Sequence, residues 1–472
     1  MGKLGIYVQV PFCQTKCTYC NFHTGVVASS RFAPYVEAVC REIRGHRELL
    51  TAAGVDWLGR LGRSGAAPLQ RKSETLEMGK RPASEGGPYT ERTLGAPTES
   101  KGEAPSEDLV LDTVYIGGGT PSLLDPAHLQ NILDAIREAF GDGAGNVRFG
   151  RRKSGGEPPH SKTTAFPTES RQVPSEINGV EFEEVTLEAD PETVEARKAA
   201  AWVRAGINRV SFGLQSFSDK ELVAAGRMHR RADIYRAVPI LREAGIRNIS
   251  FDLIAGLPHQ TKESWRQSLD ELAVLAPEHV SVYLLEIDEG SRLGKELLQG
   301  GGKYSAGAVP SEDEMAEFYE MAQEALGAAG YHHYEISNWA KPGFESRHNL
   351  KYWRREPYLG FGAGAHSFSG TERWANAHDA AAYVTAVQGG RLPVEQHEIL
   401  TADSALEEEL FLGLRQLDGI DLARIEREYG VTLRARFDPL ASAGLVERDG
   451  SVVRLAPERL SVSNEAFVEL MR

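Results

Sequence analysis

The sequence predicts an α/β protein: a partial (β/α)6 barrel followed by a smaller α+β module. Six short apolar runs alternate in order with amphipathic stretches of helical periodicity, and this rhythm ends near residue 330. Strand–helix units that follow one another imply parallel strands joined by right-handed crossovers. Six units suggest an open, partial version of the eight-stranded barrel. The chain has 472 residues, of which 41% are hydrophobic, so it is long enough for a large domain and a smaller one.

Each predicted strand is a short apolar run, and a helical pattern separates it from the next. The predicted strands are Gly5–Val10, Thr113–Ile116, Val185–Glu188, Arg209–Leu214, Asn248–Ile254 and His279–Leu285. The predicted helices are Arg31–Leu50, Pro126–Phe140, Pro191–Ala205, Ala232–Ala244, Lys262–Leu275 and Ser311–Ala329. We therefore place the barrel in residues 1–300.

Two segments interrupt the barrel pattern. Residues 59–108 and 150–178 are rich in glycine, serine, proline and mixed charge, and each holds a single aromatic residue. Such a composition buries too little apolar surface to offset the entropy of ordering the chain. We expect both segments to be disordered insertions in the barrel.

Beyond the barrel, the pattern predicts two further regions. Residues 301–400 are an expected barrel extension, with a strand at Tyr331–Trp339 and a loop region rich in glycine and aromatic residues through Ser369. Residues 401–472 form a module with an expected hairpin around Asp449-Gly450. Three short helices before this hairpin suggest a winged-helix-like arrangement, and they are Leu406–Leu417, Leu422–Tyr429 and Leu433–Ala443.

Composition and charge exclude several classes of protein. Lysine and arginine number 53 against 67 aspartate and glutamate, and the net charge of −14 argues against binding the nucleic acid backbone. No run of about 18 apolar residues occurs, so we expect no membrane-spanning helix. The N-terminus enters an apolar strand directly, without the layout of a secretory signal. Three of the four cysteines lie within eight residues, which favours a cytoplasmic protein over a secreted disulfide framework.

The clustered cysteines follow the first predicted strand with the spacing Cys-x3-Cys-x2-Cys. The thiolates of Cys13, Cys17 and Cys20 suit an iron–sulfur cluster or zinc. Three thiolates bind three irons of a cubane and leave the fourth iron open, whereas structural zinc normally has four ligands, of which His23 could be the last. Catalytic loops gather at the carboxyl end of barrel strands, so this position favours a [4Fe–4S] cluster, with zinc as the alternative. Cys40 lies in a helical pattern and is expected to be a small buried residue.

Glycines and polar residues mark the ends of the later strands. The segment Gly117–Thr120 ends the second strand, where glycines allow backbone groups to approach a ligand closely. Polar residues within apolar strands, such as Glu188, Gln215 and Asp252, are costly unless they are paired. Arg227 follows the fourth strand and could bind a carboxylate through two hydrogen bonds. A structural ion pair or a tight turn explains any one of these alone, but their joint placement favours a ligand site.

Together these residues resemble the radical S-adenosylmethionine (SAM) superfamily, whose signature is Cys-x3-Cys-x-aromatic-Cys after a first strand. The resemblance implies that SAM binds the open iron and that one electron cleaves it to methionine and a 5′-deoxyadenosyl radical. The strand residues are also similar, in order and spacing, to the oxygen-independent coproporphyrinogen III oxidase family, over nearly all of the chain except the insertions. This implies that Gln215 and Asp252 contact ribose or adenosyl groups and that Arg227 contacts the SAM carboxylate. The full SAM set that it implies is Tyr7, Tyr19, Gly118, Gly119, Thr120, Glu188, Gln215, Arg227 and Asp252.

Two branches of that family differ at marker positions. Its oxidases carry a further cysteine two residues after the third cluster ligand, where this sequence has Phe22, and a longer segment before the cysteines. Its heme-chaperone branch carries a His-Asn-x-x-Tyr-Trp motif, present here at residues 348–353. The resemblance to that branch implies heme contact by His348, Tyr352 and Trp353. From the residues alone, a packed loop in which His348 only forms hydrogen bonds is the favoured alternative. The candidates for the iron ligand are His348, His366 and His229.

The resemblance therefore implies a heme chaperone that binds heme, a [4Fe–4S] cluster and SAM. It implies delivery of heme to a membrane-bound respiratory apoprotein on the cytoplasmic face, with a docking partner favoured over insertion into the membrane. The protein would then be cytoplasmic and peripheral at the inner face of the membrane, and a homodimer is compatible with the sequence. The alternatives are an oxygen-independent coproporphyrinogen III oxidase and a structural zinc protein without enzymatic activity.

Overall fold

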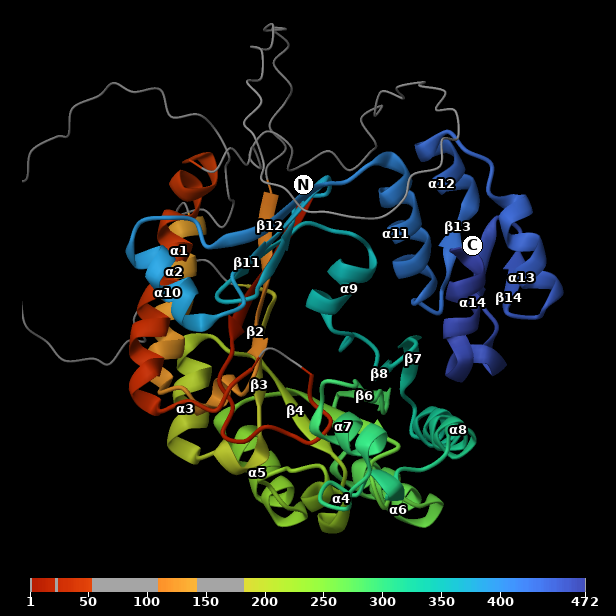
Figure 1. Ribbon diagram of the computed structural model, residues 1–472, viewed down its shortest axis with the longest axis horizontal. Helices are drawn as coiled ribbons and strands as arrows, with labels where there is room; N and C mark the ends of the chain where they lie inside the picture. Colours follow the sequence, from red (N-terminus) through yellow and green to blue (C-terminus); the bar gives the residue numbers. More distant parts are fainter. Residues whose placement is uncertain (1, 22–23, 53–108, 142–181, 472) are drawn as a thin grey trace, which may run out of the picture.

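The fold was obtained as a computed structural model, which describes residues 2–21, 24–52, 109–141 and 182–471 (Figure 1). The two insertions that the sequence predicts, at residues 59–108 and 150–178, lie outside the described residues, as do Phe22 and His23. No helix in the described part of the chain is long and apolar enough to cross a membrane.

Six parallel strands in chain order form the centre of the molecule and confirm the predicted partial barrel. The strands are β1 (Gly2–Val10), β2 (Leu109–Gly118), β3 (Glu184–Ala189), β4 (Arg209–Gln215), β5 (Asn248–Ala255) and β6 (His279–Leu284). The helices between and after them are α1 (Phe32–Ala52), α2 (Pro126–Phe140), α3 (Ala196–Ala205), α4 (Asp219–Ala224), α5 (Arg231–Ala244), α6 (Lys262–Leu275), α7 (Arg292–Gln299) and α8 (Glu312–Ala328). The predicted helix at Pro191–Ala205 is divided, because Pro191–Thr193 forms a separate short 3-10 turn.

The sheet continues beyond both edges of the barrel strands. The hairpin of β7 (His332–Glu335) and β8 (Asn338–Ala340) pairs with β6, and β9 (Tyr358–Phe361) pairs in parallel with β1. From β9 the sheet extends through antiparallel strands, which makes it twelve-stranded. These strands are β10 (His366–Phe368), β11 (Glu372–Asn376) and β12 (Val394–Ile399), with α10 (Ala380–Gln388) between the last two.

Two sequence-based expectations for this extension are wrong. The single strand expected at Tyr331–Trp339 is a hairpin, because the buried Glu335 carboxylate accepts hydrogen bonds from Ser337 N (2.9 Å) and Asn338 Nδ2 (2.6 Å) and stabilises the turn. The expected loop region through Ser369 instead contains α9 (Arg347–Trp353), β9 and β10. Strands of three or four residues are too short to show a clear alternation of apolar and polar residues.

The C-terminal module has, in order, a helix, a short strand, two helices, a hairpin and a final helix. Its elements are α11 (Ala402–Leu414), β13 (Ile420–Asp421), α12 (Leu422–Tyr429), α13 (Asp438–Ser442), β14 (Val446–Asp449), β15 (Val452–Leu455) and α14 (Ser463–Leu470). The three strands form an antiparallel sheet in the order β13-β15-β14. The hairpin turns at Asp449-Gly450 as predicted, and Gly450 has a φ of 62°, which glycine adopts at little cost. The module lies beside α8 and α9 in Figure 1.

The two faces of the barrel sheet differ in chemistry. On β1, Leu4, Ile6, Val8 and Val10 are fully buried in the main apolar core, to which α1 and α2 also contribute. Because side chains alternate along a strand, the intervening residues of β1 face the inside of the barrel. The inner face is largely polar, and its residues include Tyr7, Thr113, Tyr115, Thr186, Glu188, Arg209, Ser211, Asp252, His279 and Ser281.

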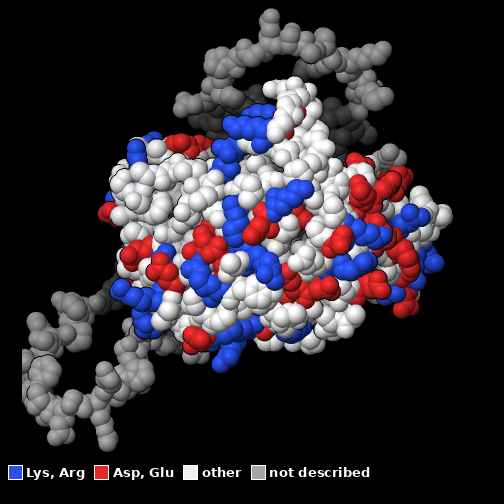
Figure 2. Space-filling view, turned by 90° about the horizontal axis from the view of Figure 1, so that it is seen from below, with Lys and Arg blue, Asp and Glu red and all other residues white. Residues whose placement is uncertain are grey.

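The outer surface carries charges of both signs. Figure 2 shows lysine, arginine, aspartate and glutamate side chains interspersed over the face seen from below. An exposed ion pair joins Lys262 on α6 to Glu317 on α8. Such exposed pairs add little to stability individually. The stability of the barrel therefore depends mainly on the apolar layer between sheet and helices.

One buried carboxylate joins α1 to the extension. Glu42 accepts hydrogen bonds from Gly362 N (2.9 Å), Asn376 Nδ2 (2.7 Å) and Tyr383 OH (2.6 Å). Burial raises the pKa of Glu42 from 4.5 to about 7. The carboxyl group therefore connects α1, the turn after β9, β11 and α10 at a point closed to solvent.

Replacing Glu42 by alanine should lower the free energy of unfolding by about 3 kcal/mol, because three buried donors lose their acceptor. Glu42→Gln keeps an acceptor and should cost less. The pH dependence of the free energy of unfolding should also differ between wild type and Glu42→Gln.

The pKa of Glu42 is higher in the folded than in the unfolded chain. The contribution of Glu42 to stability is therefore complete below pH 4.5 and is lost as the pH rises through about 7. The Glu42→Gln variant should not show this loss of stability as the pH rises, because its amide does not titrate.

Urea unfolding of wild type and both variants between pH 4 and about 8 measures these effects. A Glu42→Ala midpoint equal to that of the wild type would show that Glu42 does not join these elements.

Candidate functional site

The cysteine loop lies at the carboxyl end of β1 and is held there by the glycine turn after β2. Gly119 N donates to Val10 O (2.8 Å), and Thr120 N donates to Phe12 O (2.7 Å). A Cβ on Gly119 would collide with the Phe12 carbonyl, so only glycine permits this close approach. The glycine turn therefore fixes the start of the cysteine loop.

The other side of the loop is held by α4 and α7. Thr18 N donates to Ala225 O (3.0 Å), and Leu293 N donates to Thr18 O (2.8 Å). Arg292 also donates from Nη1 to Lys16 O (3.0 Å). These bonds hold the segment around Cys17 between the ends of the two helices.

The three thiols of this loop lie in different surroundings. Cys17 is buried, whereas Cys13 and Cys20 are partly exposed. Burial raises the pKa of Cys13, and the nearby Cys20 and Cys17 raise it further. Among the described residues, no three Cys, His, Asp or Glu side chains are already gathered as a metal centre. Cys40 is buried on α1, as predicted.

A buried arginine joins three strand ends to the cysteine loop. Arg227 forms an ion pair with Asp190 through Nη2, and the same nitrogen donates to Gly213 O at 2.8 Å. Its Nη1 donates to Cys17 Sγ at 3.4 Å. Asp190 in turn accepts a hydrogen bond from Thr120 Oγ1 at 3.2 Å. The glycine turn after β2, the ends of β3 and β4, and the cysteine loop are thus linked through one guanidinium group.

Asp190 was missed in the sequence analysis. It lies two residues after Glu188 and directly before Pro191, at the carboxyl end of β3. A carboxylate at that edge of a parallel sheet is a signal that could have been found. From the sequence, Arg227 is expected to contact the SAM carboxylate. In this structure its guanidinium group already forms an ion pair with the carboxylate of Asp190.

Glu188 is held on the inner face of the barrel beside the glycine turn. Its carboxylate accepts hydrogen bonds from Gly118 N (2.8 Å) and Tyr115 OH (2.9 Å). Burial raises the pKa of Glu188 from 4.5 to about 7. Tyr7 lies nearby on β1, stacks on Tyr115 with ring centroids 6.0 Å apart, and donates to Gln9 Oε1 at 2.6 Å.

The remaining residues of the predicted SAM set lie around the same strand ends. Gln215 ends β4 with a φ of 68°, a strained conformation for this residue type, and its amide lies against Gly213. On β5, Asp252 accepts from Ser211 Oγ at 3.2 Å, and burial raises its pKa. Tyr19 packs on a small apolar cluster that includes Leu293. The structure therefore distributes these residues over the carboxyl ends of β4 and β5 and the cysteine loop.

The motif residues expected to contact heme lie on α9. His348 is 1% exposed. Its imidazole ring forms two hydrogen bonds, one between Nδ1 and Thr113 Oγ1 (3.0 Å) and one between Nε2 and Tyr352 OH (2.9 Å). Burial lowers its pKa to about 3, so the imidazole is neutral. The backbone N–H groups of Arg347 and His348 donate to Glu184, at the start of β3. Helix α9 therefore lies against the inner face at the amino ends of β2 and β3.

The three histidines proposed as iron ligands differ in accessibility. Both ring nitrogens of His348 are engaged, so it can coordinate iron only if α9 leaves its place. His229 is also fully buried, and its Nε2 donates to Leu214 O at 3.0 Å. His366 is exposed on β10. The aromatic Trp353 lies further along α9 at a cavity of about 330 Å³ that it shares with residues of the C-terminal module.

Comparison with known proteins identifies the class that this fold and site define. Residues 7–272 match the radical SAM superfamily, and residues 400–458 match the HemN C-terminal domain. The solved structure of coproporphyrinogen III oxidase (HemN) from Escherichia coli, titled as a radical SAM enzyme, superposes with a TM-score of 0.69. It covers 99% of this chain and 90% of that chain at 19% identity, which is a similarity of fold. The class is therefore that of radical SAM proteins with a HemN-type C-terminal domain.

Curated relatives define the family more closely. A protein of Bacillus subtilis named heme chaperone HemW is 29% identical over 98% of this chain and 97% of its own length. A protein of the same name from Synechocystis is 30% identical over 89% of this chain and 79% of its own length. This chain belongs to the HemW family of HemN-like radical SAM proteins.

Removing the Asp190 carboxylate should destabilise the cluster-free protein by about 3 kcal/mol, because Arg227 would remain buried without its partner. The double variant Asp190→Leu with Arg227→Met should recover most of this loss, since a buried ion pair can be replaced by apolar side chains of similar volume. Urea unfolding of Asp190→Ala, the double variant and the wild type measures both effects.

Glu183→Ala is the matched control, because the Glu183 side chain is 43% exposed and pairs with Arg347 at the surface. Its loss should cost about 1 kcal/mol or less. Equal losses for Asp190→Ala and Glu183→Ala would contradict a structural role of the buried pair.

Proposed function

We propose that this protein is a heme chaperone that binds a [4Fe–4S] cluster and SAM and delivers heme to membrane-bound respiratory apoproteins. The observation that supports it most is the cysteine loop fixed beside Arg227, Asp190 and Glu188 in a chain of the HemW family. Relatives from several bacteria bear the name heme chaperone HemW. Delivery would take place at the cytoplasmic face of the membrane, where a docking partner would bring this acidic protein to its target.

In this proposal Cys13, Cys17 and Cys20 hold the cluster. The donor set fits, because three thiolates are soft ligands that suit iron and leave one iron of a cubane open. The bonds of Thr18 and Leu293 fix the backbone around Cys17, so the loop needs to bring only the two more exposed thiols toward it. The side chain of Cys17 is also oriented, because Arg227 Nη1 donates a hydrogen bond to its sulfur atom.

The strand ends also fit SAM. Arg227 Nε is buried and has no hydrogen-bond partner among the described residues, so it offers a donor to a ligand carboxylate. The glycine turn lets backbone groups approach the methionine amino group, with Glu188 beside it. Gln215 and Asp252 would bind the ribose or adenosyl part, and Tyr19 would lie beside adenine. When bound, SAM supplies a 5′-deoxyadenosyl radical on one-electron cleavage, and the protein orients it and excludes water.

Heme contact by His348, Tyr352 and Trp353 stays a prediction, and the geometry adds a condition to it. His348 would have to give up its hydrogen bonds to Thr113 and Tyr352 before it could bind iron. His366 needs no such change, because it is already exposed.

One anaerobic experiment separates this function from the alternatives. The protein is reconstituted with iron and sulfide and then given heme or coproporphyrinogen III with SAM and a reductant. A chaperone should bind heme stoichiometrically and release no CO₂ from coproporphyrinogen III. Decarboxylated product at multiple turnovers would identify an oxidase instead, and one zinc per chain without absorbance near ~400 nm would identify a structural zinc protein.

Replacing Cys17 by alanine should abolish the cluster absorbance near ~400 nm after reconstitution while the barrel stays folded, because the open cubane needs all three thiolates. Cys40→Ala is the matched control, since Cys40 is also buried but lies on α1. Iron content, absorbance and circular dichroism of both variants provide the measurement. Full cluster content in Cys17→Ala would show that the ligand assignment is wrong.

A further inference from the structure

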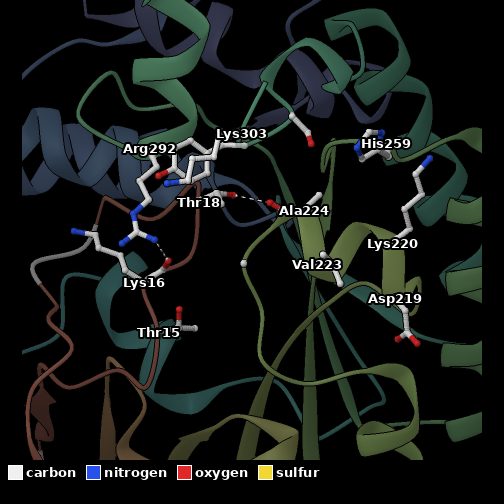
Figure 3. Close-up of a pocket in the computed structure, with 13 residues that line it drawn as sticks. Thr15, Lys16, Thr18, Asp219, Lys220, Val223, Ala224, His259, Arg292 and Lys303 are labelled. Atoms are coloured by element: carbon white, nitrogen blue, oxygen red, sulfur yellow. Dashed lines mark hydrogen bonds between the residues drawn. The ribbon is translucent and has the colours of Figure 1, made fainter. Parts of the chain in front are cut away.

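A cavity of about 660 Å³ lies directly beside the cysteine loop (Figure 3). One wall is the loop itself, with Thr15, Lys16 and Thr18, and the opposite wall is formed by α4 and the residues around it. Arg292 at the start of α7 and the segment 303–305 complete the lining. This volume is in the range of sites that bind cofactors and other small molecules.

The cavity concentrates positive charge in a protein whose net charge is −14. Lys16, Lys220, Arg292 and Lys303 line it, and none of them has a carboxylate within ion-pair distance in the described part of the chain. The acidic residue in the lining, Asp219, accepts a hydrogen bond from the backbone N–H of Arg231. Figure 3 shows Lys16, Arg292 and Lys303 gathered on one side and Lys220 with His259 on the other. The cavity is therefore suited to an anion with more than one charged group.

The walls of the cavity are held in strained backbone conformations. His259 and Ser305 both line it, and their φ values are 69° and 61°, a region that non-glycine residues rarely adopt. Hydrogen bonds maintain both, since His259 N donates to Ala308 O (2.7 Å) and the Glu296 carboxylate accepts from Tyr304 N (2.7 Å) on the same segment as Ser305. Strain of this kind tends to cluster at ligand sites.

The lining also offers apolar surface next to the cations. Val223 is 57% exposed and lies in the wall from α4. On the other side the Lys303 ammonium lies over the Tyr304 ring, 5.3 Å from its centroid. An inorganic anion would use only the charges, whereas a ligand with an apolar body and peripheral carboxylates would use both.

We propose that this cavity binds the carboxylates of heme, with Lys16, Arg292 and Lys303 on one side and Lys220 on the other. The proposal rests on the proposed heme-chaperone function, because heme is the dicarboxylate that this function requires. The cavity needs no displacement of α9, unlike a site at His348. It also places heme against Lys16 and Thr18, the two neighbours of the proposed cluster ligand Cys17.

The test compares heme binding by full-length wild type and two charge-matched variants. Lys220→Ser with Lys303→Ser removes two cations from the cavity. Lys295→Ser with Arg266→Ser removes two exposed cations that are not in the lining. Heme is titrated anaerobically and followed by absorbance, at low and high salt. Heme dimethyl ester, which has no free carboxylates, and inorganic phosphate as a competitor are titrated in parallel.

The cavity variant should bind heme about tenfold more weakly than wild type, with a smaller dependence on salt, because two of the cations that face the heme carboxylates are removed. The control variant should bind like wild type, and the dimethyl ester should bind all three proteins equally weakly. Equal heme affinity of wild type and cavity variant would overturn the cavity assignment and leave the chaperone function in place. Absence of heme binding by wild type would overturn both. Phosphate that displaces heme at micromolar concentration would assign the cavity to a small anion and also overturn the proposal.

Discussion

The architecture of the site depends on one buried guanidinium group. Arg227 follows β4, yet it contacts Asp190 after β3, the Gly213 carbonyl within β4 and the Cys17 thiol of the loop after β1. A buried arginine without these acceptors would cost several kcal/mol. The loop, the strand ends and the glycine turn must therefore keep their relative positions for the arginine to remain satisfied. A separate set of backbone bonds from α4 and α7 fixes the other side of the loop.

The division between an apolar outer layer and a polar interior explains how one sheet can provide both stability and a site. Alternation along the strands sends Leu4, Ile6 and Val8 toward the helices and Tyr7 into the barrel. Some inner polar residues pair with one another, as Glu188 does with Tyr115, whereas Thr186 Oγ1, Arg209 Nε and Arg227 Nε are buried without a hydrogen-bond partner among the described residues. Helix α9 closes the amino end of this interior, and its Lys351 pairs with the buried Asp112 at 2.8 Å. The carboxyl end of the strands, where the cysteines lie, is therefore the end that is open to ligands.

Much of the fold and part of the candidate site could be predicted from the sequence. The six strand–helix units, the cysteine spacing and the Asp449-Gly450 hairpin have local signals, because periodicity and turn chemistry are read within a few residues. Helix α9 and strands β9 and β10 could not be predicted, since they are stabilised by partners such as Glu184 and β1 that are distant in sequence. For the same reason His348 was placed in a loop, although its hydrogen bonds to Thr113 and Tyr352 hold it inside the barrel. The place of Asp190 at the end of β3 is a signal in the sequence, but its pairing with Arg227 is apparent only when β3 and β4 are brought together.

The proposed function requires that the cysteine loop binds a [4Fe–4S] cluster whose open iron binds SAM. Electron paramagnetic resonance of the anaerobically reconstituted and reduced protein, with and without SAM, tests it most directly. We expect the signal of one reduced [4Fe–4S] cluster per chain, with g values that shift when SAM is added. We also expect the shift to be lost in the double variant Asp190→Leu with Arg227→Met, in which no buried charge is left unpaired, while the cluster signal remains. A signal that SAM leaves unchanged in the wild type, or one zinc per chain and no cluster signal, would show that this loop does not hold a SAM-binding cluster.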